Sequence, residues 1–398
     1  ALHNAGLGVV MDVVYNHTYY SYSWLERTVP GYWNRRWENG SLTNGSGCGC
    51  DLASERTMVR KYLVDSCVYW AKEYHIDGFR FDLMALHDVD TMNAIRAALD
   101  ALPGGEDILM YGEPWQGGST RMEHGAIPAN KQAAGLLDSR IGFFCDDTRD
   151  AIKGGVFNAG SAGYINGDMH CGYQVLHSIP AWRGGQADFM PQAPGQVVQY
   201  VSAHDNYTLW DKLKCVARRG DYAAPDADLL AQNRMAAGIY LTCQGLPFMQ
   251  GGEEFARTKH GDHNTYRGPL DLNRLDWTRA AQLEELVQYY HGLLEIRKAY
   301  PELSGMAGDA EPCILSLPGW LIGFVPERRG ESLPGRLAVY YNPERTRQWA
   351  ALPAGSWRYL CDGTHAAAEA LGPACRNAIE IAPGSGKMLK VEGVSGGF

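Results

Sequence analysis

The sequence lacks the features that mark several classes of protein. No apolar run approaches the roughly 20 residues that a membrane-spanning helix needs. Ten cysteines among 398 residues are too few for a disulfide scaffold, and no Cys-x-x-Cys pair or Cys/His cluster has zinc spacing. The sparse thiols favour the cytoplasm over secretion. The formal net charge of −9 argues against nucleic acid or an anionic membrane as partner, whereas a neutral ligand such as a sugar is compatible with it.

The chain also begins without an initiator methionine and without a charged-then-apolar signal segment. Residues 1–6 are typical of the end of a helix with a glycine stop, and an apolar strand follows at once. A start inside a helix-to-strand connection leads us to expect that the chain was cut from a longer protein.

Short apolar segments alternate with longer amphipathic ones, which predicts a parallel sheet with crossover helices. The predicted strands span residues 8–15, 76–82, 107–112, 141–145, 197–203 and 246–250. The predicted helices span residues 55–74, 91–102, 229–242 and 281–300. Six strand–helix units are two short of a closed barrel. We therefore predict an α/β fold, a (β/α)8 TIM-type barrel that lacks its first two strands.

The pattern changes near residue 308. From there on, short β-like runs are separated by Pro, Gly and Asn turns, which predicts a small antiparallel β domain. The predicted organisation is a partial barrel with the catalytic residues over residues 1–308, followed by an antiparallel β-sandwich over residues 309–398.

Charged residues stand at the ends of four predicted strands. Asp12 lies in an apolar run that ends at Asn16 and His17, and a buried carboxylate of this kind needs polar partners. In the next strand Arg80 and Asp82 point to one face because side chains alternate. A guanidinium favours the ionised form of a neighbouring carboxylate, which suits a nucleophile, although a structural ion pair would give the same pattern.

The other two clusters have the same position relative to their strands. Glu113 comes at a strand end before a proline, and the neighbouring Trp115 could desolvate it, which suits a general acid. His204 and Asp205 follow the fifth strand, where they could hydrogen-bond sugar hydroxyls. Each cluster alone is also compatible with a structural or surface role. Their common position at carboxyl strand ends predicts one site.

The order of these clusters resembles the four signature regions of the α-amylase superfamily, and the residues within each region are similar to those of type I pullulanases. The matching stretches are Asp12-Val-Val-Tyr-Asn-His17, Asp77-Gly-Phe-Arg-Phe-Asp-Leu-Met84, Tyr111-Gly-Glu-Pro-Trp115, Tyr200-Val-Ser-Ala-His-Asp-Asn206, Thr208-Leu-Trp-Asp-Lys212 and Gly252-Glu-Glu-Phe-Ala-Arg-Thr-Lys259. The resemblance covers residue 7 to about residue 300.

The resemblance implies a role for each site residue. Asp82 is expected to be the nucleophile, Glu113 the acid/base and Asp205 the stabiliser of the transition state. Substrate contacts are expected from Asn16, His17, Arg80, Trp115 and His204, with Asp12 as a structural support behind them.

The implied function is retaining hydrolysis of α-1,6 branch linkages in pullulan, amylopectin or glycogen-type α-glucans. The alternatives are an isoamylase-type debranching enzyme, an α-1,4-glucan hydrolase, or an inactive glucan-binding fragment. The expected partner is an α-glucan oligosaccharide or polysaccharide, and the full-length parent is expected to be monomeric. No cofactor or metal is expected. Some relatives bind structural calcium, but the sequence has no EF-hand-type run of oxygen ligands.

Overall fold

The computed structural model of the chain describes residues 1–123, 125–185, 188–306, 311–327 and 337–392. Contacts within the chain define two compact units. The first unit contains residues 1–144 and 182–198, and the second contains residues 145–181 and 199–398.

The first unit is built on a parallel sheet whose strands follow one another in sequence order. The strands are β1 (Val10–Val13), β4 (Gly78–Phe81), β5 (Leu109–Gly112), β6 (Ile141–Phe144) and the start of β7 (Val197–Gln199). The order does not reverse at any point in this series. Such an order is typical of a β/α barrel, whereas a doubly wound sheet has a switch point.

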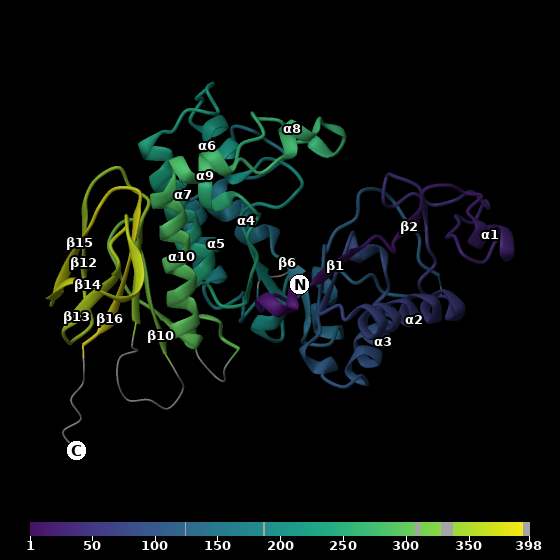
Figure 1. Cartoon of the computed structure of the whole chain (residues 1–398). Helices are drawn as coiled ribbons and strands as arrows, with labels where there is room; N and C mark the ends of the chain where they lie inside the picture. The colour runs from purple at the N-terminus through teal and green to yellow at the C-terminus, as the bar shows by residue number, and fades with distance from the viewer. Residues whose placement is uncertain (124, 186–187, 307–310, 328–336, 393–398) are drawn as a thin grey trace, which may run out of the picture. The chain divides into compact units, whose positions relative to one another are not determined.

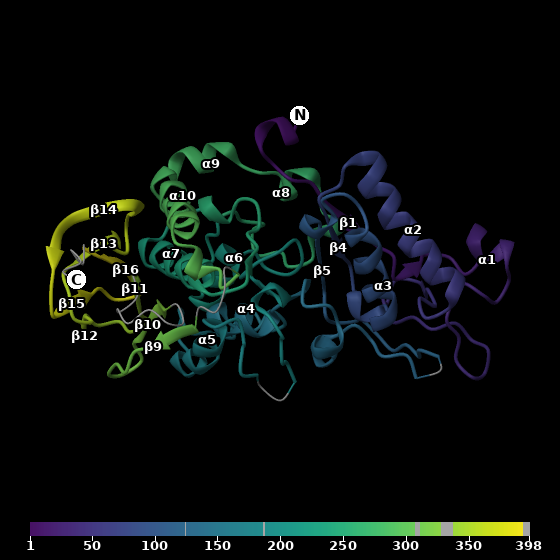
Figure 2. The same cartoon turned by 90° about the horizontal axis from the view of Figure 1, so that it is seen from below.

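Two helices of the first unit, α2 (Thr57–Tyr74) and α3 (Val89–Asp100), pack side by side (Figure 1 and Figure 2). Helix α2 buries Val59, Leu63 and Cys67, the residues whose spacing of three and four predicted it. Asp88 caps α3, because its side chain accepts a hydrogen bond from the amide of Thr91. The remaining elements of this unit are short: η1 (His3–Ala5), β2 (His17–Thr18), α1 (Trp24–Thr28), β3 (Cys50–Asp51), η2 (Met84–Leu86), η3 (Gly105–Asp107), η4 (Lys131–Leu136) and η6 (Pro194–Gln196).

The second unit consists of helices followed by a β-rich part. Its helices are α4 (Asp146–Lys153), α5 (Gly172–Ser178), α6 (Leu209–Val216), α7 (Ala227–Thr242), α8 (Leu270–Asn273), α9 (Trp277–Gln282), α10 (Glu284–Ala299) and the single turns η5 (Met169–Cys171), η7 (Glu253–Phe255), η8 (Thr265–Arg267) and η9 (Pro301–Leu303). Strand β8 (Leu246–Pro247) follows β7 in the sheet order, since the amide of Phe248 donates to the carbonyl of Gln199 (2.8 Å).

The β-rich part has two antiparallel sheets. The strands are β9 (Glu311–Ile314), β10 (Ile322–Glu327), β11 (Leu337–Asn342), β12 (Gln348–Ala351), β13 (Trp357–Cys361), β14 (Ala366–Cys375), β15 (Ala378–Ile381) and β16 (Ser385–Val391). Six of them form one sheet in the order β14-β13-β16-β11-β10-β9, and β12 pairs with β15. Along β11, Val339 and Tyr341 join the core with α7 and α10, while Ala338 and Tyr340 join the core with β12 and β15. This alternation is the period of two expected of a strand. The last strands of the chain, β13 to β16, are drawn in yellow in Figure 1.

Most predicted elements are confirmed, with bounds that differ by a few residues: the strands are shorter than predicted, whereas α7 begins two residues before the predicted helix. The strand predicted over residues 197–203 ends at Gln199, and the helix predicted over 281–300 is divided at Leu283, whose φ of −112° and ψ of 34° interrupt it. The predicted domain boundary between residues 308 and 309 lies outside the described residues, so that division stays a prediction. Among the described helices, none is long and apolar enough to cross a bilayer.

Candidate active site

The strand register of the first unit brings its predicted charged residues together. Asp12 on β1 lies opposite Arg80 on β4, and Arg80 lies opposite Tyr111 on β5. Asp82 and Glu113 come one residue after the ends of β4 and β5. Because parallel strands end at one edge of the sheet, these side chains share that edge.

Arg80 joins three carboxyl groups at this edge. Its Nη1 donates to Oδ1 of Asp12 (2.7 Å) and to Oδ1 of Asp82 (3.0 Å), and its Nη2 donates to Oε1 of Glu113. The arginine is only 7% exposed. Burial alone would lower the pKa of Arg80, but Glu113, Asp12 and Asp82 outweigh burial and raise it. The guanidinium therefore stays charged and holds the three acids in one arrangement.

Glu113 is held from a second side. The amide of Leu83 donates to its Oε2 (2.8 Å), and the residue is 5% exposed. Leu83 has a φ of 40°, a left-handed conformation that costs a bulky residue about 1 to 3 kcal/mol. Gly112 precedes Glu113, and a Cβ atom there would lie 2.7 Å from both the Cβ of Met84 and the carbonyl oxygen of Phe81. Local backbone strain and close packing thus fix the acid beside Asp82.

Asn16 contacts Asp82 from the segment that follows β1, and His17 in turn contacts Asn16. Asn16 is fully buried, and its Nδ2 donates to the carbonyl of Asp82 (2.7 Å) and to its Oδ2 (2.9 Å). His17 Nδ1 lies 2.6 Å from Oδ1 of Asn16, so the proton on Nδ1 is the one this contact requires. Burial lowers the pKa of His17, although Asp82 and Asp51 act in the opposite direction. A neutral imidazole leaves Nε2 as an acceptor.

Buried polar contacts support the strand that carries His17. His17 pairs with Asp51 across β2 and β3. Asp51 is fully buried and accepts hydrogen bonds from Oγ1 of Thr43 (2.7 Å) and from the amide of Gly45 (2.8 Å). The long loop between β2 and β3 is therefore tied to the pairing partner of His17.

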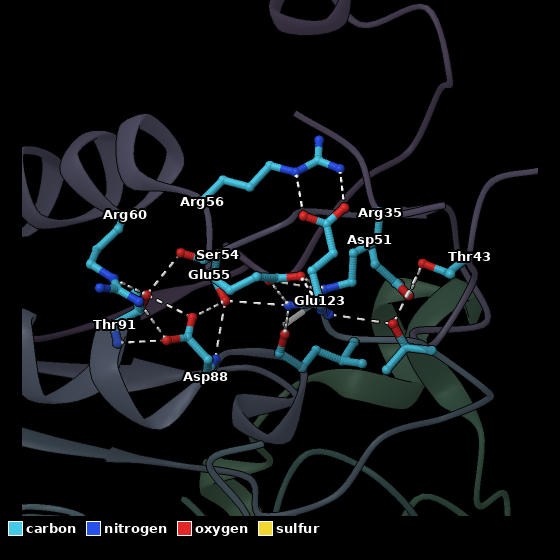
Figure 3. Close-up of polar contacts among 12 residues, drawn as sticks. Arg35, Thr43, Asp51, Ser54, Glu55, Arg56, Arg60, Asp88, Thr91 and Glu123 are labelled. Carbon is cyan, nitrogen blue, oxygen red and sulfur yellow. Dashed lines mark hydrogen bonds and ion pairs between the residues drawn. The ribbon is translucent and has the colours of Figure 1, made fainter. Parts of the chain in front are cut away.

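The network continues to the start of α2 and α3, as Figure 3 shows. Arg35 is fully buried, and its Nη2 donates to Oε2 of Glu55 (2.8 Å) and to the carbonyl of Leu86 (2.9 Å). The hydroxyl of Ser54 donates to Oδ2 of Asp88 (2.7 Å). Because Leu86 belongs to the turn that follows Asp82, one network supports the segments that carry His17 and Asp82. This network was not predicted from the sequence, where its only trace is the density of charged residues near Glu55.

Trp115 follows β5 in the first unit and is partly exposed. His204 and Asp205 belong to the second unit, where His204 Nε2 lies 3.6 Å from Oδ1 of Asp205. Their side chains are 60% and 65% exposed. The structure thus brings together Asp12, Asn16, His17, Arg80, Asp82 and Glu113. The convergence of Asp205 with Asp82 and Glu113 stays a prediction.

Within the ranges that the structure describes, no three His, Cys, Asp or Glu side chains are arranged to hold a metal ion.

No family model matches the chain. Similar proteins are nevertheless known. The chain is 41% identical to a pullulanase of Bacillus subtilis (strain 168) over 311 residues, which cover 75% of this chain and 41% of that protein.

Solved structures give the same result. The pullulanase from Bacillus acidopullulyticus has a TM-score of 0.87 at 34% identity, covering 98% of this chain and 47% of that one. The type I pullulanase from Bacillus subtilis str. 168, in complex with maltose, has a TM-score of 0.86 at 33% identity, covering 98% and 55%. The chain spans less than half the length of the curated relatives it matches.

Together with the strand order, these relatives show that the chain is of the α-amylase class of glycoside hydrolases. Within that class, the chain belongs to the pullulanase family.

Proposed function

We propose that the chain carries the catalytic residues for retaining hydrolysis of α-1,6 linkages in pullulan and related α-glucans. The observation that supports this most directly is the single guanidinium of Arg80, which binds the carboxyl groups of both Asp82 and Glu113. Two acids held this close suit a retaining mechanism, which needs carboxyl groups about 5 to 5.5 Å apart, better than an inverting one.

In the proposed mechanism Glu113 protonates the glycosidic oxygen while Asp82 attacks the anomeric carbon. Water then releases the glycosyl-enzyme, with Glu113 acting as base. Arg80 and the amide of Leu83 donate to Glu113 in this structure, so the acid step requires substrate to replace one of these contacts. Contacts of this kind often rearrange when the complex forms.

The other residues have proposed roles in binding. Asn16 orients Asp82 through two hydrogen bonds, and the neutral His17 could accept a hydrogen bond from a sugar hydroxyl. Asp12 accepts a hydrogen bond from Arg80 and so orients its guanidinium. His204 and Trp115 are proposed substrate contacts, and Asp205 is the proposed stabiliser of the oxocarbenium-like transition state.

We further propose that β1 and β4 to β8 correspond to strands three to eight of an eight-stranded barrel, which their sequence order supports. The proposed ligand is an α-glucan oligosaccharide, because solved relatives are complexes with maltose, maltotriose and maltotetraose. Both chemical steps use carboxyl groups, so we propose no cofactor. The monomeric state of the parent and its cytoplasmic location stay predictions.

The test is incubation of the 398-residue chain with pullulan, followed by analysis of the products. Maltotriose supports cleavage of α-1,6 linkages, whereas panose indicates cleavage of α-1,4 linkages and contradicts the proposal. Binding of maltotriose without any hydrolysis would favour the glucan-binding alternative.

The assignment of Asp82 is tested by Asp82→Asn, which should lower kcat on pullulan at least about 1,000-fold because the amide cannot form the glycosyl-enzyme. Asp65→Asn is the matched control, since Asp65 lies exposed on α2 and pairs with Lys61. Turnover of Asp82→Asn at the level of the control would remove Asp82 from the mechanism.

A further inference from the structure

The segment 202–207, which carries His204 and Asp205, has no regular secondary structure. Strand β7 ends at Gln199, three residues before it, and α6 begins two residues after it. Asn206 has a φ of 62°, so the segment turns sharply directly after Asp205. A backbone that leaves the sheet at such a place needs other partners for its carbonyl groups.

Lys259 provides the first of these partners. Its Nζ donates to the carbonyl of His204 (3.1 Å) and to Oγ1 of Thr265 (2.8 Å). Its own amide donates to Oδ2 of Asp211 (2.7 Å). The side chain is 3% exposed, and it directly contacts the backbone of a predicted site residue.

Glu253 holds the start of the segment. Its Oε2 accepts a hydrogen bond from the hydroxyl of Ser202 (2.5 Å), and its Oε1 accepts from the hydroxyls of Tyr240 (3.0 Å) and Tyr290 (3.2 Å). All four side chains are buried. Three hydroxyl donors therefore surround one carboxyl group, and one of them, Ser202, belongs to the segment that carries His204.

Lys153, at the end of α4, contacts the other end. Its Nζ lies 3.4 Å from the carbonyl of Tyr207, and the residue is buried. Glu253 and Lys153 also attract each other electrostatically. Residues from three separate parts of the second unit thus contact the beginning, middle and end of one short segment.

We infer that Glu253, Lys259 and Lys153 form a buried clamp whose task is to position the segment 202–207, so that His204 and Asp205 keep the backbone geometry that catalysis requires. The inference deepens the proposed function, and the catalytic importance of the segment rests on that function. The three are positioning residues, because they contact the segment and the side chains packed beside it, and they act on the reaction through His204 and Asp205.

The cost of burying these groups supports a specific role. An ionisable group in a protein interior is unfavourable unless its hydrogen bonds are made, and each of the three makes them to the segment. Burial raises the pKa of Glu253 to about 7, against the hydrogen bonds from Ser202 and Tyr240, and burial lowers the pKa of Lys153 to about 7. Besides Glu253, the charged groups that act on Lys153 are Arg149, Asp150 and Lys212.

The clamp is tested by hydrogen–deuterium exchange on the full chain, comparing Glu253→Gln and Lys259→Met with wild type at one pH. We expect amides of the segment 202–207 to exchange about tenfold faster or more in both variants, because the local opening free energy falls. Ser202→Ala removes only one donor and serves as a second variant if Lys259→Met fails to fold.

Matched controls exist in the same unit. Glu302 is a buried acid outside the clamp, and Lys214 is a buried lysine that donates to the carbonyl of Ala224 (2.7 Å) instead. Glu302→Gln and Lys214→Met should leave exchange in the segment 202–207 unchanged. Wild-type exchange in the clamp variants, or equal acceleration in the controls, would overturn the inference.

Kinetics on pullulan provide the second readout. Both clamp variants should lose kcat about 10- to 100-fold with a smaller change in KM, since misplacement of transition-state groups mainly affects the chemical step. Lys259→Arg should recover part of the loss. If the wild-type chain does not hydrolyse pullulan while the variants still accelerate exchange, the proposed function fails and the clamp stands. If the wild-type chain hydrolyses pullulan but exchange in the variants is unchanged, the proposed function stands and the clamp fails.

Discussion

Replacing Glu253 with glutamine should remove a pH dependence of stability. Burial raises the pKa of Glu253 from 4.5 to about 7, although hydrogen bonds from Ser202 and Tyr240 act to lower it. The folded protein thus keeps its proton at pH values where the unfolded chain has released it. The contribution of Glu253 to the free energy of unfolding is therefore complete below about pH 4.5, where the carboxyl group is protonated in both states. It falls as the pH rises and levels off above about pH 7, where the carboxyl group is ionised in both states. The difference between 4.5 and about 7 corresponds to roughly 3 kcal/mol.

The measurement is urea unfolding followed by circular dichroism between pH 5 and pH 8, for wild type and Glu253→Gln. Over this range the free energy of unfolding of the wild type should fall by roughly 2 to 3 kcal/mol relative to the variant. Groups that do not interact with Glu253 affect both proteins equally, so the difference between the two curves reports Glu253 together with its effect on Lys153, whose pKa Glu253 raises. Loss of that effect in the variant acts in the same direction, because a lower pKa of Lys153 makes the stability of the variant rise from a lower pH. A difference that stays constant, or that increases with pH, would refute the reasoning because the carboxyl group would then not be destabilised in its ionised form.

Two further predictions concern the edge of the first sheet. Arg80→Met should lower the free energy of unfolding by about 3 to 5 kcal/mol at pH 7, because it leaves the buried Glu113 without its cation; the loss should shrink toward pH 4 in urea titrations, and an equal loss at both pH values would contradict it. Gly112→Ala should cost about 1 to 3 kcal/mol through the clash with Met84. Gly135→Ala places its methyl group in open space and should change thermal stability by less than about 1 kcal/mol, so equal shifts for the two glycines would speak against the clash.

The elements that could be predicted from the sequence are those with strong local patterns. The spacing of Val59, Leu63 and Cys67 predicted α2, and alternation along β4 predicted that Arg80 and Asp82 share a face, which their hydrogen bond confirms. Short helices such as α4, α5 and α6 were missed, since fewer than ten residues carry too little periodicity. Strand β14 contains five alanines and a glycine, a composition with low strand propensity, and it depends on pairing with β13.

Individual contacts at the site were harder to predict than its members. The sequence placed an acid and an arginine on one strand, but it contained no local indication that Arg80 would bind Glu113, 33 residues away. The same holds for Lys259 and His204, which are 55 residues apart. Such pairs depend on how elements pack, and no periodicity within one element reports that.

The predicted site residues of the first unit and those of the second unit are positioned in different ways. In the first unit the acids follow paired strands, so the register fixes their backbone, and Arg80 needs only to orient side chains that are already close. In the second unit Asp205 stands six residues beyond the end of β7, where no ladder fixes the backbone. Buried donors and acceptors such as Lys259 and Glu253 have to replace the missing ladder contacts. Substitution of a strand residue should therefore act mainly through charge, whereas substitution in the clamp should act through backbone order, which is why exchange rates and not stability alone separate the two.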